Sequence, residues 1–115
     1  MTVLVETRTW IRVCRIEDLL AERGAAALLG TDQVAIFRLH DGEVYAISNR
    51  DPFSGAYVMS RGIVGSRGES PTVASPMHKQ VFDLRTGQCL DQPEVVLPVY
   101  PVRRAGDVVE VGWQP

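Results

Sequence analysis

The chain has 115 residues, 45% of them hydrophobic and 23% charged, with a formal net charge of −2 at pH 7. These values predict one soluble globular domain, residues 1–115, large enough to bury a core without disulfides or a metal. The near-balanced charge excludes the basic surface of a protein that binds nucleic acid or anionic lipid. No apolar stretch reaches the length of a membrane span, and Glu6 and Arg8 interrupt the first apolar run, so we expect a cytoplasmic protein without a signal peptide.

In the first half of the chain, short apolar runs alternate with turn residues. Residues 9–16 alternate loosely between apolar and polar side chains, as in a half-buried strand. Residues 17–24 predict a single helical turn closed by Gly24. The runs AAALLG and QVAIFRLH predict two strands joined by the turn residues 30–32. Asp41-Gly42 predicts a hairpin with a type I′ turn, which requires positive φ.

The middle of the chain has a different composition. Residues 49–71 contain four glycines and end in a proline. This predicts a long structured loop with one short extended piece at residues 62–64. A long loop inside a small domain is often functional, so this segment is a candidate for binding.

Strand patterns return after this loop. They occur at residues 72–75 and 79–84 and on both sides of Pro101, which predicts an edge strand or a bulge. Eight to ten short strands with almost no helix predict an all-β fold, an antiparallel sandwich or barrel. The expected core is Val34, Ile36, Val44, Ala46, Phe82, Leu84, Val108 and Val111.

Two segments are more specific than this general pattern. YAISNRDPFSGAYVMSRGIVG and ASPMHKQVFDLRTGQCLDQPEVVLPVYPVR resemble the Rieske ferredoxin fold, an antiparallel β-sandwich. The resemblance implies two apical loops, here residues 49–71 and 75–80. In Rieske proteins the first loop carries Cys-x-His and the second Cys-x-x-His, and these four residues hold a [2Fe–2S] cluster.

The four ligand positions of the resemblance are almost all changed in this chain. Asp51 and Phe53 stand at the positions of the first loop, and Ser75 and His78 stand at those of the second. Only His78 is retained. An Fe–S cluster requires thiolates, so we expect no cluster, no other metal and no cofactor in this chain.

A Rieske-like domain without its ligands resembles the small subunit of assimilatory NAD(P)H-dependent nitrite reductase. Its characteristic runs appear here in order as VAIFR, YAISNRDPF, SRGIVG and ASPMHKQVFDL. The resemblance implies a subunit that supports the six-electron reduction of nitrite to ammonium. It also implies that siroheme, an Fe–S cluster and FAD belong to a large catalytic subunit, which would be the partner of this chain.

Two other functions remain open: a Rieske-type [2Fe–2S] electron-transfer protein, and a docking module for another reductase or oxygenase. Asp51, Phe53 and Ser75 argue against the first. The sequence contains no paired carboxylates and no histidine–nucleophile pattern, so we expect no catalytic residue. Cys14 and Cys89 form no metal-ligand pair, and we expect them to be structural thiols.

The tip of the second loop is a candidate surface for partner binding. In Rieske proteins this tip meets the redox partner. Met77 is an adaptable contact residue and Lys79 supplies charge. We therefore expect Met77, His78 and Lys79, together with Arg61 of the glycine-rich segment, to contact the partner.

Overall fold

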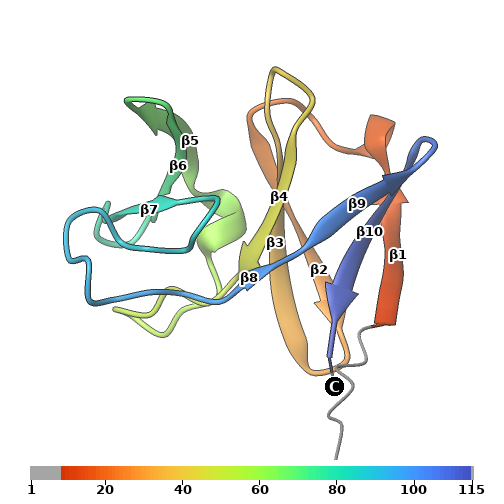
Figure 1. Ribbon diagram of the computed structural model, residues 1–115. Helices are drawn as coiled ribbons and strands as arrows, with labels where there is room; N and C mark the ends of the chain where they lie inside the picture. Colours follow the sequence, from red (N-terminus) through yellow and green to blue (C-terminus); the bar gives the residue numbers. More distant parts are fainter. Residues whose placement is uncertain (1–8, 115) are drawn as a thin grey trace, which may run out of the picture.

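The computed structural model describes residues 9–114, in which short β-strands and two single-turn 3-10 helices alternate with loops (Figure 1). In chain order the elements are β1 (Thr9–Arg15), η1 (Ile16–Asp18), β2 (Arg23–Leu29), β3 (Asp32–Arg38), β4 (Val44–Ser48), η2 (Met59–Arg61), β5 (Ile63–Arg67), β6 (Ser70–Ala74), β7 (Val81–Asp83), β8 (Val99–Tyr100), β9 (Val102–Ala105) and β10 (Val108–Trp113). All strand pairs between these elements are antiparallel. The predicted all-β fold class is therefore confirmed.

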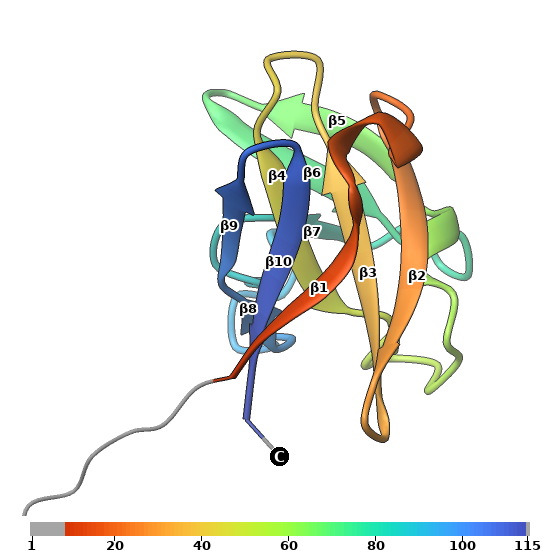
Figure 2. The same ribbon diagram turned by 90° about the vertical axis from the view of Figure 1, so that its right-hand side faces the viewer.

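The strands form three sheets, with the orders β1-β10-β9, β2-β3-β4-β8 and β5-β6-β7. The first two sheets lie against each other as a sandwich, and the third forms a smaller lobe beside it (Figures 1 and 2). The two apical loops, between β4 and β5 and between β6 and β7, belong to this smaller lobe. The chain passes from the second sheet to the first at Pro101, between β8 and β9. Both are edge strands of their sheets, which agrees with the edge strand that the proline predicted.

Strand β3 is buried on both faces and joins two separate hydrophobic clusters. Val34 and Ile36 point into the cluster between the first two sheets, and Ala35 and Phe37 point into the cluster of the smaller lobe. This arrangement explains why residues 34–37 are continuously apolar instead of alternating. Of the predicted core, Val44 and Val108 are only half-buried, and the other six residues are buried.

The predicted helical turn at residues 17–24 is wrong in its extent. Helix η1 ends at Asp18, and Gly24 lies inside strand β2. A Cβ atom at Gly24 would lie 2.3 Å from the backbone oxygen of Ser60 and 2.7 Å from Phe37 Cε1. The glycine therefore permits close contact between β2 and η2 and does not end a helix.

The hairpin at Asp41-Gly42 is confirmed, but its loop has three residues. Leu39 N–H donates to Glu43 O at 2.8 Å, and Gly42 N–H donates to Leu39 O at 3.0 Å. Gly42 has a φ of +89°, whereas Asp41 is not among the residues with positive φ. The turn is therefore not type I′. It has the features of the three-residue loop in which a glycine follows a type I turn.

The long loop predicted at residues 49–71 is shorter than expected. It ends in η2, and β5 then forms a hairpin with β6 in a ladder that runs from Ile63↔Ala74 to Arg67↔Ser70. Four of the five side chains of β5 are exposed, so its sequence lacks the alternation that identifies a half-buried strand. Pairing with β6 defines this strand, and pairing was not visible in the sequence.

Candidate functional site

The two apical loops are joined by a hydrogen bond between two residues that the sequence resemblance places at cluster-ligand positions. Ser75 Oγ–H donates to Asp51 Oδ2 at 2.5 Å. The same Ser75 oxygen accepts a longer hydrogen bond, 3.3 Å, from the backbone N–H of Met77. Asp51 Oδ1 accepts from the backbone N–H of Phe53 at 2.8 Å. The Asp51 carboxylate therefore connects the two loops and fixes the backbone of the first, while Ser75 Oγ fixes the backbone of the second.

Asp51 is fully buried, yet it remains ionised. Burial raises the pKa of its carboxyl, but the hydrogen bonds from Ser75, Phe53 and Ser54 together lower it by more, so the pKa lies below its ordinary value of 3.8. An ionised carboxylate only accepts hydrogen bonds, and here hydroxyl and backbone donors supply them.

The other two expected ligand positions, Phe53 and His78, do not take part in this hydrogen bond. Phe53 is half-buried and packs against the core of the smaller lobe, with its ring centroid 6.1 Å from that of Phe82. His78 is exposed, within the turn that the hydrogen bond from Lys79 N–H to Ser75 O closes. The structure thus places one apolar ring and one exposed imidazole where two histidine ligands would stand.

The donor set at these positions does not fit a [2Fe–2S] cluster. Two of the positions would need thiolates, and they carry a carboxylate and a hydroxyl that bind each other. The third, Phe53, has no ligand atom. In residues 9–114 no group of three or more His, Cys, Asp and Glu side chains gathers where it could hold a metal ion. The geometry supports a structural role for the pair Asp51–Ser75.

The expected contact residues of the second loop are exposed. Met77, His78 and Lys79 all face solvent, and Lys79 adopts a φ of +62°. Its backbone N–H donates to Ser75 O at 2.9 Å, which holds this turn. Arg61 is also exposed and lies at the same end of the β5–β6 hairpin, because Ile63, two residues later, pairs with Ala74.

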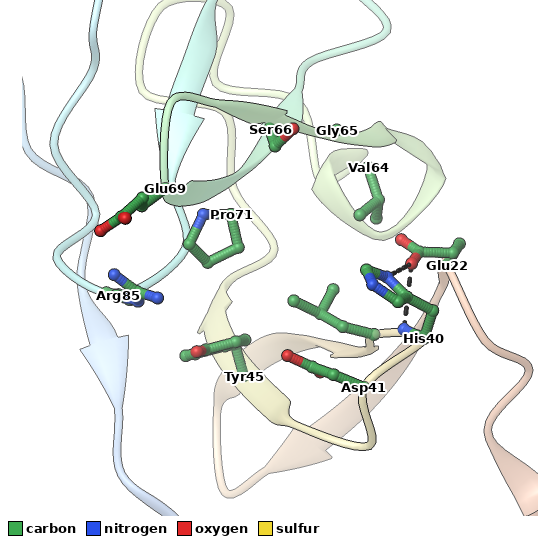
Figure 3. Close-up of a pocket in the computed structure, with 11 residues that line it drawn as sticks. Glu22, His40, Asp41, Tyr45, Val64, Gly65, Ser66, Glu69, Pro71 and Arg85 are labelled. Carbon is green, nitrogen blue, oxygen red and sulfur yellow. Dashed lines mark hydrogen bonds and ion pairs between the residues drawn. The ribbon is translucent and has the colours of Figure 1, made fainter.

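A separate hollow of about 260 Å³ lies between the β3–β4 loop and the β5–β6 hairpin (Figure 3). At one end, His40 Nδ1 lies 2.7 Å from Glu22 Oε1, and Arg85 and Glu69 line the other end. The His40–Glu22 contact is solvent-exposed, and such pairs contribute at most about 1 kcal/mol. The sequence did not reveal this hollow, because its residues come from four segments without a common motif.

The two cysteines do not form a reactive site. Cys89 is buried in the core of the smaller lobe, as predicted for a structural thiol. Cys14 is only half-buried, and burial followed by the charge of Asp18 raises the pKa of its thiol. A raised pKa keeps a thiol protonated and unreactive.

Comparison with known proteins identifies the family. The pattern of the Rieske-like [2Fe-2S] domain family matches residues 9–112. The nitrite reductase (NADH) small subunit of Escherichia coli K12 is 43% identical over 103 residues, which cover 89% of this chain and 95% of that protein. This chain belongs to the nitrite reductase small-subunit family.

Solved structures of the family share the fold of this chain. The NADH-dependent nitrite reductase small subunit assigned in Mycobacterium tuberculosis superposes with a TM-score of 0.92 at 47% identity, and the match covers 96% of this chain and 99% of that one. The sequence resemblance to the nitrite reductase small-subunit family is thus confirmed. The fold of this family is the Rieske-like sandwich.

A further relative is a much longer protein. The nitrite reductase [NAD(P)H] large subunit of Klebsiella oxytoca is 39% identical over 108 residues, which cover 94% of this chain but only 11% of that protein. A domain like this small subunit is therefore part of a large-subunit polypeptide in that organism. In residues 9–114 of the present chain, no helix is long and apolar enough to cross a membrane.

Proposed function

We propose that this chain is the small, non-catalytic subunit of an assimilatory NAD(P)H-dependent nitrite reductase. It supports the six-electron reduction of nitrite to ammonium, and the chemistry takes place on a large subunit that carries siroheme, an Fe–S cluster and FAD. The observation that carries the proposal is 43% identity to the E. coli small subunit over nearly the whole length of both chains. We propose that residues 1–115 act there as one domain in the cytoplasm.

The large subunit is the expected partner. The support comes from Klebsiella oxytoca, where a domain of this family is part of the large-subunit polypeptide. Two domains joined in one chain are held at a high effective concentration, so a weak contact between them suffices. Where the small subunit is a separate chain, it needs a surface that binds the large subunit without this help.

We assign this contact to Arg61, Met77, His78 and Lys79. All four are exposed, and Met77 retains 48% of its accessible surface. The hydrogen bond between Asp51 and Ser75 gives the second loop a fixed shape, which reduces the entropy lost on binding. Because all four are exposed, their replacement tests binding without removing buried side chains.

Affinity purification of the tagged chain from its own host, grown with nitrite as nitrogen source, tests the proposal. We expect a large partner to co-purify and to show siroheme and flavin absorption. Replacement of Met77, His78 and Lys79 by alanine should reduce this recovery while the isolated chain keeps its circular dichroism spectrum. Recovery with a different reductase or oxygenase would instead support the docking-module function, and iron with sulfide in the chain alone would support electron transfer.

A further inference from the structure

We propose that the small subunit docks on an acidic surface of the large subunit through one basic and partly apolar face. This face, here called the apical face, consists of the exposed residues Arg50, Tyr57, Arg61, Ile63, Met77 and Lys79. The inference rests on the proposed function and adds the chemistry of the partner surface. It follows from the charges, the exposed apolar side chains and the hydrogen bonds at this end of the molecule.

Contacts between backbone and side chains bring the apical face together from three segments. Arg50 and Tyr57 pair in an isolated bridge at the base of the first loop. The next residue, Asp51, binds Ser75 at the start of the second loop, and Lys79 lies near the other end of that loop. Ile63 pairs with Ala74, the residue before Ser75, so η2 and the start of β5 lie beside the second loop.

The segment that builds the apical face is basic, although the whole chain is slightly acidic. Residues 49–80 contain four Lys and Arg but two Asp and Glu, whereas the whole chain contains 12 and 14. Of the two carboxylates, Asp51 is buried in the hydrogen bond with Ser75. Glu69 lies next to the turn at Gly68, at the opposite end of the β5–β6 hairpin. The exposed charges of the apical face are therefore positive.

Three carboxylates from other segments border the apical face, and each already has a partner. Glu22 binds His40 at 2.7 Å, and Asp32 accepts from Trp113 Nε1 at 2.9 Å. Asp91 accepts from the backbone N–H of Val81 at 3.0 Å and forms an ion pair with Arg67 at 3.5 Å. Hydrogen bonds from neutral donors leave a carboxylate negative, so Asp32 keeps its charge beside the face. In the described residues none of these carboxylates forms an ion pair with Arg50, Arg61 or Lys79, so these three cations remain open to carboxylates of a partner.

The apical face also exposes large apolar side chains. Tyr57 is 54% exposed, Ile63 is 76% exposed and Met77 is 48% exposed. Exposed apolar groups surrounded by charge are typical of surfaces that bind another protein. The combination favours a partner surface that has acidic side chains around an apolar recess.

Binding of charge-reversed subunits to the purified holo large subunit tests the inference. In Arg50→Glu/Lys79→Glu both positive charges are reversed, and we expect a dissociation constant at least tenfold higher, mainly through a slower association rate. The matched control is Arg15→Glu/Arg104→Glu, which has the same net charge but is changed on β1 and β9, in the sheet farthest from the smaller lobe. We expect binding by the control to remain within about twofold of the wild-type value.

The salt dependence of binding tests the contribution of the charged residues, and an apolar variant tests the contribution of the apolar residues. Wild-type binding should weaken when the salt concentration rises from about 0.05 M to about 0.3 M, because salt screens exposed charges. Tyr57→Ala/Met77→Ala should weaken binding but keep this salt dependence. Equal effects of the two charge-reversed pairs, or salt-independent binding, would overturn the acidic partner surface while leaving the subunit assignment intact. No binding by the wild-type chain would overturn both.

Discussion

Asp51 is a buried carboxylate whose partners among the described residues are a hydroxyl and backbone N–H groups. Burial of a charge without compensation is costly, so each donor around Asp51 matters to stability. Ser75 supplies the shortest of these hydrogen bonds and also accepts one from Met77. The resemblance to Rieske proteins implied that both residues stand at ligand positions. It did not show their contact, because they are 24 residues apart and meet only when the two loops fold.

Replacement of Ser75 by alanine should destabilise the chain measurably. Ser75→Ala removes the hydroxyl donor and leaves Asp51 Oδ2 buried without it, which costs about 1–3 kcal/mol in free energy of unfolding. Urea denaturation at pH 7 measures this loss. Ser66→Ala, at an exposed position of β5, is the matched control and should stay within about 0.5 kcal/mol of wild type. Equal stability of both variants would show that the hydrogen bond contributes nothing.

The ionisation of Asp51 also predicts how stability depends on pH. Its pKa is lower in the folded chain than the ordinary value of 3.8, so its contribution to stability is complete above that value and is lost as the pH falls through the folded pKa. Asp51→Asn lacks this group. We therefore expect the wild-type chain to lose more stability than Asp51→Asn between pH 5 and pH 2 in urea denaturation, and parallel curves would contradict the assignment.

At the scale of elements, the strands whose sequences alternate or are continuously apolar were predicted, whereas β5, which is defined by pairing, was predicted only as a short extended piece at residues 62–64. β3 and β10 are apolar enough to be recognised from sequence alone. β5 is exposed at four of five positions, so only its ladder with β6 makes it a strand. Gly24 was predicted to close a helix because glycine commonly does so. In the structure its missing side chain makes room for η2, and this contact between distant segments has no local signal.

Gly24→Ala should therefore be clearly destabilising. The new methyl group would overlap the backbone oxygen of Ser60, which cannot move away as a flexible side chain would. We expect a loss of about 1–3 kcal/mol, the usual cost of overpacking. Gly65→Ala is the control, since a Cβ there would meet only Thr72 Oγ1 at 3.5 Å. Urea denaturation compares the two, and equal midpoints would mean that β2 and η2 adjust freely.

At the scale of the whole molecule, β3 makes the sandwich and the smaller lobe depend on each other. Its side chains alternate between the two hydrophobic clusters, so neither cluster is complete without the same strand. Small domains usually unfold in one cooperative step, and a shared central strand favours this behaviour. The sequence predicted residues of both clusters as a single core, because periodicity shows that a residue is buried but does not show against which neighbours.

A substitution that destabilises the smaller lobe should therefore also lower the unfolding midpoint of the sandwich. Leu84→Ala removes a buried side chain from the smaller lobe and should cost about 2–5 kcal/mol. Trp10 and Trp113, the two tryptophans, lie on β1 and β10, so their fluorescence reports the sandwich. We expect the fluorescence midpoint in urea to fall together with the circular dichroism midpoint.

The matched control is Leu28→Ala, since Leu28 is 69% exposed on β2 and its loss should change the midpoint little. An unchanged fluorescence midpoint in Leu84→Ala, with an earlier transition in circular dichroism, would mean that the lobes unfold separately.

The pairing of β1 with β10 has a consequence for synthesis of the chain. Thr9 lies opposite Trp113, so the first described strand has no partner until the last one has been made. At about 5–20 residues per second, β1 waits roughly 5–20 s on the ribosome with an open edge. Unpaired strands are sites of aggregation, and charged residues within them limit it. Arg12 and Arg15, on β1, are suited to protecting the nascent chain during this interval.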